Sequence, residues 1–289
     1  MHKFLILLLL AASAAAADHP VSMWRVDGEQ NTIYLLGSVH LLRKQDHPLP
    51  AVIEAAYEDA EALVMELDMD DLDPAAIQSI SNRLGMLPEG KTLRDVMGDE
   101  LYREAAGMAT AIDIPFEMLS RTEPWFAAIT IEQMALLRIG FNPLYGIEMH
   151  MAMKASQDNK EIEGLETVEQ QLTFLDSLSL DAQKDLLMQT LAESGEIELI
   201  MDDLIQAWRH GDVAWLEEQV LKEMTGFDEL YDAIVVRRNQ AWVESIVELL
   251  DDEDDYLIVV GALHLVGEDG VPALLSARGI RTGQMNESL

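Results

Sequence analysis

The 289-residue chain contains no cysteine. This absence excludes disulfide frameworks, thiol catalysis, cysteine-ligated zinc and iron–sulfur clusters. Any bound metal must therefore be held by histidine, carboxylate or carbonyl groups. Basic residues are also scarce, because 19 Lys and Arg face 53 Asp and Glu and leave a formal net charge of −34. Nucleic-acid binding needs clustered Lys and Arg to neutralise phosphates, so a nucleic-acid partner is not expected.

A strongly apolar run long enough to suggest targeting occurs only at the start of the chain. Lys3 precedes the apolar stretch Phe4–Leu10, and an alanine-rich segment follows as far as Ala17. This order predicts a secretory signal peptide over residues 1–17, cleaved after Ala17. The alternative is an uncleaved anchor, but the apolar stretch is short for the ~30 Å of a bilayer core. We expect an exported protein, periplasmic or secreted, with no stable membrane anchor after cleavage.

Apolar periodicity predicts strands near both ends of the chain and helices between them. Strands are expected as a hairpin at 24–26 and 32–36, and as buried runs at 62–67 and 256–260. Helices are expected over 50–62, 74–84, 99–111, 124–139, 148–157, 168–175, 181–195, 196–210, 227–250 and 271–278. The predicted fold class is α/β (α+β), with a central sheet from both ends and a helical insertion at about 71–250. Residues 18–289 are expected to form a single domain.

The two ends of the chain repeat one another. Residues 32–60 contain a strand, then Gly37-Ser38-Val39-His40, a polar loop and a helix opening at Pro50. Residues 256–278 contain a strand, then Gly261-Ala262-Leu263-His264, a polar loop and a helix opening at Pro272. A single G-x-x-H segment carries little information, but two in the same strand–loop–helix context indicate an internal duplication.

This duplication predicts a site at the carboxyl edge of the sheet, where open α/β sheets bind ligands. If the two repeated strands are parallel neighbours, His40 and His264 can converge on one point. Glu66 ends a third apolar strand and could complete a set of two imidazoles and one carboxylate. Such a set with open positions is typical of catalytic divalent-metal sites.

The chain resembles the TraB/GumN/Tiki family, which is related more distantly to erythromycin-esterase-like hydrolases. The resemblance covers nearly all of the mature chain. Its motifs are Met23–Val26, Gly37–His40, the Glu66 strand, Glu123–Trp125, Gly146–Glu148, Gly164–Thr167, Arg238-Asn239 with Trp242, and Gly261–His264. It implies that His40, Glu66 and His264 bind a divalent cation (Mn, Co or Zn) needed for hydrolysis of a peptide or protein substrate. The family often has Lys at position 123 and Asp at position 148, where this chain has Glu.

Other polar residues near these motifs are candidates for supporting roles. Glu148 and Glu166 each follow a glycine-containing turn and are candidates for the general base or for extra ligation. Arg238 could stabilise an oxyanion or orient a carboxylate, and Asn239 could orient a metal ligand. His47 could support the site or be solvated, whereas His150 and His210 are expected at the surface.

Ser38 lies inside the first motif, but its counterpart in the second motif is Ala262. A serine nucleophile shared by both motifs is therefore not expected, and Ser38 remains a candidate for a supporting or substrate contact.

Three functions follow from this pattern. The leading one is an exported, metal-dependent hydrolase, most simply a peptidase, that activates water at a site of two His and one Glu. The second is a noncatalytic exported module that binds peptide or polysaccharide around a structural metal. The third is an esterase-like hydrolase. Substrate identity, the metal and the oligomeric state are left open by the sequence.

Overall fold

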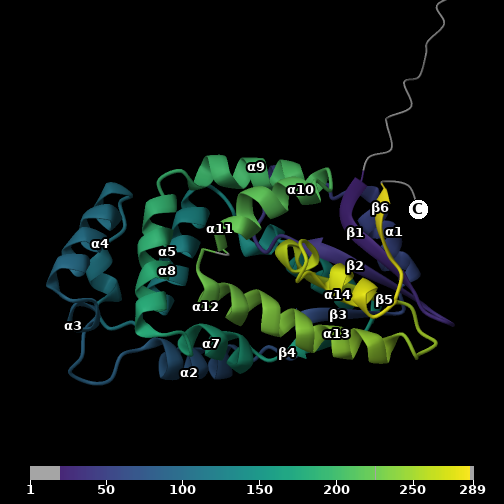
Figure 1. Ribbon diagram of the computed structural model, residues 1–289, viewed down its shortest axis with the longest axis horizontal. Coiled ribbons are helices and arrows are strands. Elements are labelled where there is room, and N and C mark those ends of the chain that lie inside the picture. Colours follow the sequence, from purple (N-terminus) through teal and green to yellow (C-terminus); the bar gives the residue numbers. More distant parts are fainter. Residues whose placement is uncertain (1–19, 225, 287–289) are drawn as a thin grey trace, which may run out of the picture.

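The computed structural model describes residues 20–224 and 226–286, so the predicted signal peptide at 1–17 lies outside the described residues. Its centre is a six-stranded mixed sheet in the order β4-β3-β5-β2-β1-β6 (Figure 1). The strands are β1 (Pro20–Asp27), β2 (Thr32–Ser38), β3 (Ala62–Leu67), β4 (Ile162–Glu166), β5 (Tyr256–Gly261) and β6 (Thr282–Asn286). Helices lie on both faces of the sheet, which confirms the predicted α/β class.

The two repeated strands are parallel neighbours. Strand β5 lies between β2 and β3 and pairs in parallel with both, and Ser38 in β2 is opposite Gly261 in β5. Strand β4 adds in parallel to the far side of β3, whereas β1 is antiparallel to both β2 and β6. The carboxyl ends of β2, β5, β3 and β4 therefore share one edge of the sheet.

Helices fill the spaces between and beside the strands. They are α1 (Ala51–Asp59), α2 (Pro74–Gly85), α3 (Leu93–Met97), α4 (Asp99–Ala111), α5 (Pro124–Arg138), α6 (Ile147–Asp158), α7 (Val168–Asp176), α8 (Leu180–Glu193), α9 (Ile197–Arg209), α10 (Val213–Leu216), α11 (Lys222–Met224), α12 (Asp228–Tyr231), α13 (Arg237–Leu249) and α14 (Val271–Ala277). Short π-helical turns join α10 to α11 and α12 to α13, at Glu217–Leu221 and Asp232–Val236.

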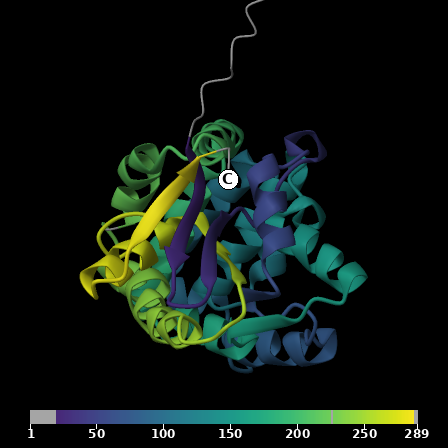
Figure 2. The same cartoon turned by 90° about the vertical axis from the view of Figure 1, so that its right-hand side faces the viewer.

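Alternate residues of the central strands point to opposite faces, as the two-residue period of a strand requires. One face packs Leu36, Met65 and Val259 against α1, α6 and α9. The other packs Leu35, Val64 and Ile258 against α13 and α14. In the view along the sheet, the strands lie between these two layers of helix (Figure 2).

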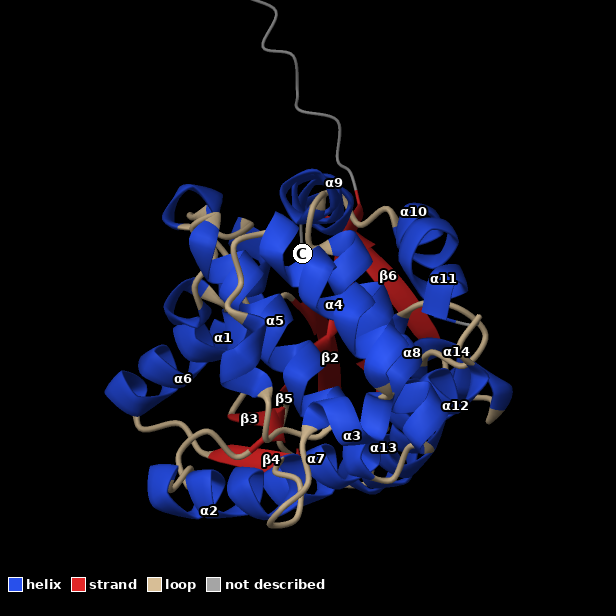
Figure 3. Ribbon diagram, turned by 90° about the vertical axis from the view of Figure 1, so that its left-hand side faces the viewer, coloured by secondary structure: helices blue, strands red, loops and turns tan. Residues whose placement is uncertain are grey.

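Beside the sheet, helices α3, α4, α5 and α8 enclose a third apolar core, which includes Leu93, Ala105, Ile131 and Leu187. Figure 3 shows α4, α5 and α8 in front of the red strands of the sheet. These helices come from the middle of the chain, as the periodicity predicted.

Two strands and several boundaries differ from the sequence prediction. Strand β4 belongs to the stretch predicted to be helical, and its Ile-Glu-Gly-Leu-Glu sequence is too polar and too short to show as a buried run. Strand β6 was also not predicted, because Thr282–Asn286 contains glycine and amide residues rather than β-branched ones. The predicted helix 227–250 is divided by the π-helical turn at Asp232–Val236.

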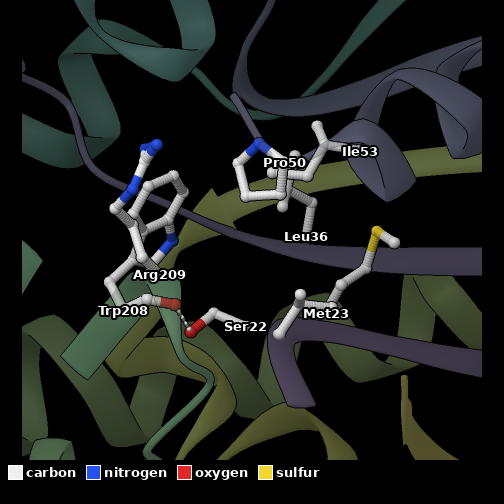
Figure 4. A pocket seen from close by; sticks show the side chains of 8 residues that line it. Ser22, Met23, Leu36, Pro50, Ile53, Trp208 and Arg209 are labelled. Atoms are coloured by element: carbon white, nitrogen blue, oxygen red, sulfur yellow. Dashed lines mark hydrogen bonds between the residues drawn. The ribbon is translucent and has the colours of Figure 1, made fainter. Parts of the chain in front are cut away.

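A small recess at the start of β1 is lined by apolar side chains and by Arg209 (Figure 4). Ser22 and Trp208 meet there, and the Ser22 hydroxyl donates to the Trp208 carbonyl. The recess contains none of the predicted site residues, so it marks the packing of α9 on the sheet. Within residues 20–224 and 226–286, no helix combines the length and apolar character needed to cross a membrane.

Candidate active site

The predicted site residues gather at the shared carboxyl edge of the parallel strands. Glu66 is near the end of β3 and Glu166 is the last residue of β4. His40 follows β2 and His264 lies in the turn Ala262–Leu265 that follows β5. Thus the duplication places one histidine after each of two neighbouring strands.

Gly261 lies where three of these side chains converge. A Cβ atom built on Gly261 would lie 3.4 Å from Glu66 Oε1, 3.5 Å from His264 Cδ2 and 3.6 Å from His40 Nε2. The absent side chain therefore leaves space that both imidazoles and the carboxylate face. The Gly261 amide also donates to Glu66 Oε1 at 2.8 Å, which fixes that carboxylate.

His40 is the exposed member of the site. Its side chain is 58% exposed, and its Nδ1 atom lies 2.7 Å from Glu148 Oε1. Glu148 lies in the first turn of α6, and Ser38 donates a hydrogen bond to the same carboxylate oxygen. With Nδ1 directed at Glu148, the Nε2 atom of His40 is turned toward Gly261.

His264 is buried, and Asn239 fixes its tautomer. The Asn239 amide nitrogen lies within hydrogen-bond distance of the carbonyls of His264 and Asp269, so Oδ1 is the atom that faces His264 Nδ1, at 2.7 Å. Because Oδ1 only accepts, Nδ1 of His264 carries the proton and Nε2 holds the lone pair. Asn239 therefore lies beside His264, a candidate ligand.

Arg238 connects the buried half of the site. Its Nη2 atom lies 2.6 Å from Glu66 Oε2 and its Nη1 atom 3.1 Å from His264 Nε2. Its Nε atom donates to Glu166 at 3.0 Å, and the guanidinium lies 4.7 Å from the Trp242 ring centroid. Arg238 is therefore a buried cation held between two carboxylates and a histidine.

Gln171 on α7 was not predicted as a site residue. Its amide donates to Glu66 Oε2 at 3.1 Å and to Glu166 Oε2 at 3.3 Å, so it bridges the two carboxylates. The Gly164–Thr167 motif was the sequence feature that could have identified Gln171. Thr167 forms a capping box at the start of α7, which places Gln171 one turn into the helix.

Opposite charges alternate through the site. The charge of Glu148 and its hydrogen bond to the imidazole raise the pKa of His40 to about 10. Burial would raise the pKa of Glu66, but its interactions with His264, His40, Arg238 and the Gly261 amide outweigh burial and lower that pKa to about 2. Burial lowers the pKa of His264 to about 3. At neutral pH the site thus contains a protonated His40, an ionised Glu66 and a neutral His264.

The side chains have the donor types that a divalent cation needs. His40 and His264 each pair through Nδ1 with a polar partner, an arrangement common for metal-ligating histidines. Among the described residues, however, no group of three or more His, Asp or Glu side chains is placed to hold a metal ion. Arg238 stands between Glu66 and His264 instead. The three side chains therefore have donor atoms of the kind that a divalent cation binds. Two of them, Glu66 and His264, are in contact with Arg238.

The remaining candidates lie apart from this cluster. His47 Nε2 pairs with the Tyr145 carbonyl, and its ring lies 5.5 Å from the ring of His150. His150 pairs with Glu54 at 2.8 Å, and His210 pairs with the Gln206 carbonyl within α9. His47 therefore lies in a second cluster between α1 and α6 and has no described contact with His40 or His264.

The Pro124-Trp125 pair is a helix start with a packing tryptophan, at the residue where the predicted helix 124–139 begins. Helix α5 begins at Pro124, and the Trp125 side chain is fully buried. Glu123 precedes the helix, and burial raises its pKa. Glu123, where the family often has Lys, therefore lies immediately before the first residue of α5.

With this geometry in place, comparison with known proteins identifies the class. The model of the TraB/PrgY/gumN family matches residues 22–284, and the chain belongs to this family. The family resemblance predicted from the sequence is therefore confirmed.

Individual relatives are similar at modest identity. The uncharacterized protein YbaP of Escherichia coli (strain K12) is 24% identical over 84% of this chain and 87% of YbaP. Metalloprotease TIKI2 of Xenopus tropicalis is 23% identical over 85% of this chain and 56% of TIKI2. Metalloprotease TIKI1 of Danio rerio is 20% identical over 85% of this chain and 59% of TIKI1. The chain thus spans little more than half of these metalloproteases. No solved structure matches the chain.

Proposed function

We propose that this protein is an exported hydrolase that cleaves peptides at the His40–Glu66–His264 edge of the sheet. The observation that carries the proposal is the contrast between the two repeated histidines. His40 is exposed and paired with a carboxylate, whereas His264 is buried and locked by Asn239. Metalloprotease names among the relatives support hydrolysis, and the signal-like residues 1–17 support export.

In this proposal His40 exchanges protons with the substrate. Glu148 holds the imidazole through Nδ1, so Nε2 is the atom presented to a bound substrate. Because His40 is protonated at neutral pH, it enters the reaction as an acid that can donate to a developing oxyanion or to the leaving amine. Water adds to the carbonyl carbon and the C–N bond breaks as the amine takes the His40 proton; the imidazole that remains takes the proton lost by that water, which restores protonated His40.

The buried residues hold this edge in place. Arg238 keeps Glu66 ionised and positioned, and its hydrogen bonds are directed at Glu66, Glu166 and His264. These contacts favour a positioning role for Arg238 and for Glu166. Glu66 Oε1 faces the space at Gly261 and is the buried carboxylate nearest to the exposed His40.

The divalent cation is part of the proposal. Because Nε2 of His40 carries the exchanged proton, Glu66 and His264 would hold the cation, which would supply Lewis acidity that lowers the pKa of water and polarises a carbonyl. Its identity among Mn, Co and Zn would follow from elemental analysis of the purified protein.

The first prediction concerns the exposed histidine. His40→Ala should lower peptide hydrolysis by about 100-fold or more, the usual contribution of a positioned acid or base. Cleavage of a peptide library, followed by mass spectrometry with each divalent ion supplied, measures this change. His210→Gln is the matched control, because it removes an imidazole on α9, outside the site, and should retain activity.

The alternatives have distinct outcomes in the same experiment. Wild-type protein that binds peptides or polysaccharides without turnover, whatever ion is supplied, would contradict the hydrolase proposal. Cleavage of small esters but of no peptide would replace the substrate class with esters. Equal peptide hydrolysis by wild type and His40→Ala would remove His40 from the reaction.

A further inference from the structure

Arg238 occupies the side of the site at which two predicted metal ligands present their lone pairs. Its Nη1 atom faces His264 Nε2, which is the only lone-pair nitrogen of that ring once Asn239 fixes the proton on Nδ1. Its Nη2 atom lies 2.6 Å from Glu66 Oε2. A guanidinium therefore neutralises the donors that would otherwise face a metal cation.

The guanidinium is held firmly in this position. Glu166 accepts from Nε at 3.0 Å and from Nη2 at 2.9 Å, and the Ile234 carbonyl accepts from Nη1 at 3.3 Å. The Trp242 ring lies beneath the guanidinium. Arg238 is only 9% exposed. Five neighbouring groups thus fix one side chain, and Glu166 has no other described cation partner.

The lone pair of His264 Nε2 cannot accept from Arg238 and bind a metal at the same time. A divalent ion beside a buried guanidinium would also be repelled at short range, where protein surroundings screen charge weakly. Entry of a cation at this position therefore requires Arg238 to leave it.

We propose that Arg238 is a built-in competitor for the divalent cation, so that guanidinium and metal are alternative occupants of the Glu66–His264 position. The proposal rests on the metal-binding part of the proposed function. It adds that this chain tunes its own metal affinity through Arg238, and that Glu166 is the carboxylate that retains the guanidinium in the metal-free state.

The second prediction tests this competition by metal binding rather than by activity. Arg238→Ala removes the competing cation from Glu66 Oε2 and His264 Nε2, so affinity for Mn²⁺, Co²⁺ or Zn²⁺ should rise roughly 10- to 100-fold, the range over which partners of metal ligands act. Equilibrium dialysis of each metal against wild type and variant gives the ratio. The double variant Arg238→Ala/His264→Ala should lose the gain, because it lacks a proposed ligand.

Arg238→Ala leaves two buried carboxylates without their partner and is expected to be less stable. Arg238→Gln keeps hydrogen-bond donors without the charge and serves as the second variant. If either variant folds poorly, added metal should restore its refolding yield, which is itself a readout of binding. Equal or weaker affinity in both variants, with no rescue by metal, would overturn the competition. If the wild-type protein does not hydrolyse peptides, the proposed function is contradicted. The ratio of metal affinities between variant and wild type still tests the competition.

Discussion

Two glycines bring the site together at the residue scale, and they do so differently. A Cβ on Gly261 would make ordinary contacts of 3.4–3.6 Å with Glu66, His264 and His40. A Cβ on Gly146 would lie 2.0 Å from the carbonyl oxygen of His40, a backbone atom that cannot step aside. Glycine at position 146 therefore allows the backbone there to approach the His40 carbonyl closely. Glycine at position 261 leaves open the space that Glu66, His264 and His40 face.

The third prediction separates these two requirements. Gly261→Ala should fold with near wild-type Tm but lose peptide hydrolysis, because its methyl group fills the point that three side chains face. Gly146→Ala should lose stability by about 1–3 kcal/mol or more, the usual cost of overpacking. Denaturant unfolding and hydrolysis measured on both variants check the contrast. A Gly261→Ala variant with full activity would show that this space is not used.

The sequence could predict these residues only in part. The duplicated G-x-x-H segments identified His40 and His264, because repetition in the same context is visible in a sequence. The strand Ala62–Leu67 identified Glu66. The sequence could not predict that His40 is exposed whereas His264 is buried and fixed. This difference depends on Asn239 and Arg238, which contact His264 from helix α13.

At the element scale, α1 and α6 are joined by a cluster of charged groups. Glu54 on α1 accepts from Lys154 at 2.7 Å and pairs with His150 at 2.8 Å, both on α6, while Glu58 binds only Lys154 in this cluster. Helix α6 carries Glu148, the partner of His40, in its first turn. The cluster therefore holds a helix that orients the exposed histidine.

The fourth prediction is a pH dependence of stability from Glu54. Burial would raise its pKa, but the hydrogen bonds from Lys154 and His150 outweigh it and lower that pKa. The stabilisation is therefore fully present above the unfolded-state pKa of about 4.3 and is lost as pH falls through the lower folded-state pKa. Glu54→Gln should lower Tm at neutral pH and lose this deficit in acid.

Glu58→Gln is the matched control, because it removes a more exposed carboxylate that binds only Lys154. Exposed ion pairs contribute little, so its Tm should stay close to wild type. Thermal unfolding followed by circular dichroism across the acid range gives both curves. A Glu54→Gln deficit that persists unchanged in acid would contradict the electrostatic cause.

Elements were predictable where burial imposes a strong pattern. The central strands are buried on both faces and read as apolar runs, and the long helices show clear periodicity. Strand β4 escaped prediction because it lies at the sheet edge and carries Glu163, Gly164 and Glu166, which tertiary pairing with β3 accommodates. A Cβ on Gly164 would lie 2.5 Å from the Asp68 amide, so glycine allows the approach of the two chain segments.

At the scale of the whole molecule, α5 joins the helical core to the sheet core. Ala128 and Ile131 belong to the core enclosed by α3, α4, α5 and α8. Leu136, later on the same helix, belongs to the core beneath α1, α6 and α9. A continuous helix with one part in each core couples their stabilities, which favours the single domain expected for residues 18–289.

The fifth prediction is one cooperative unfolding transition. Calorimetric and van't Hoff enthalpies should agree, as they do for a two-state unit. Ile131→Ala removes a fully buried side chain and should cost about 2–5 kcal/mol, moving the entire transition to lower temperature. Two resolved transitions, of which Ile131→Ala shifts only one, would show separate domains instead.

The position of β5 between β2 and β3 also sets when the site can form. The hydrogen bond from Gly261 to Glu66 joins residues 195 positions apart in the chain. Contacts this distant in sequence form slowly, because the entropy of closing the loop is lost before the contact is made. A nascent chain that has not yet reached Tyr256 can form helices but not the central sheet. The candidate site can therefore form only after synthesis has reached His264, late in folding.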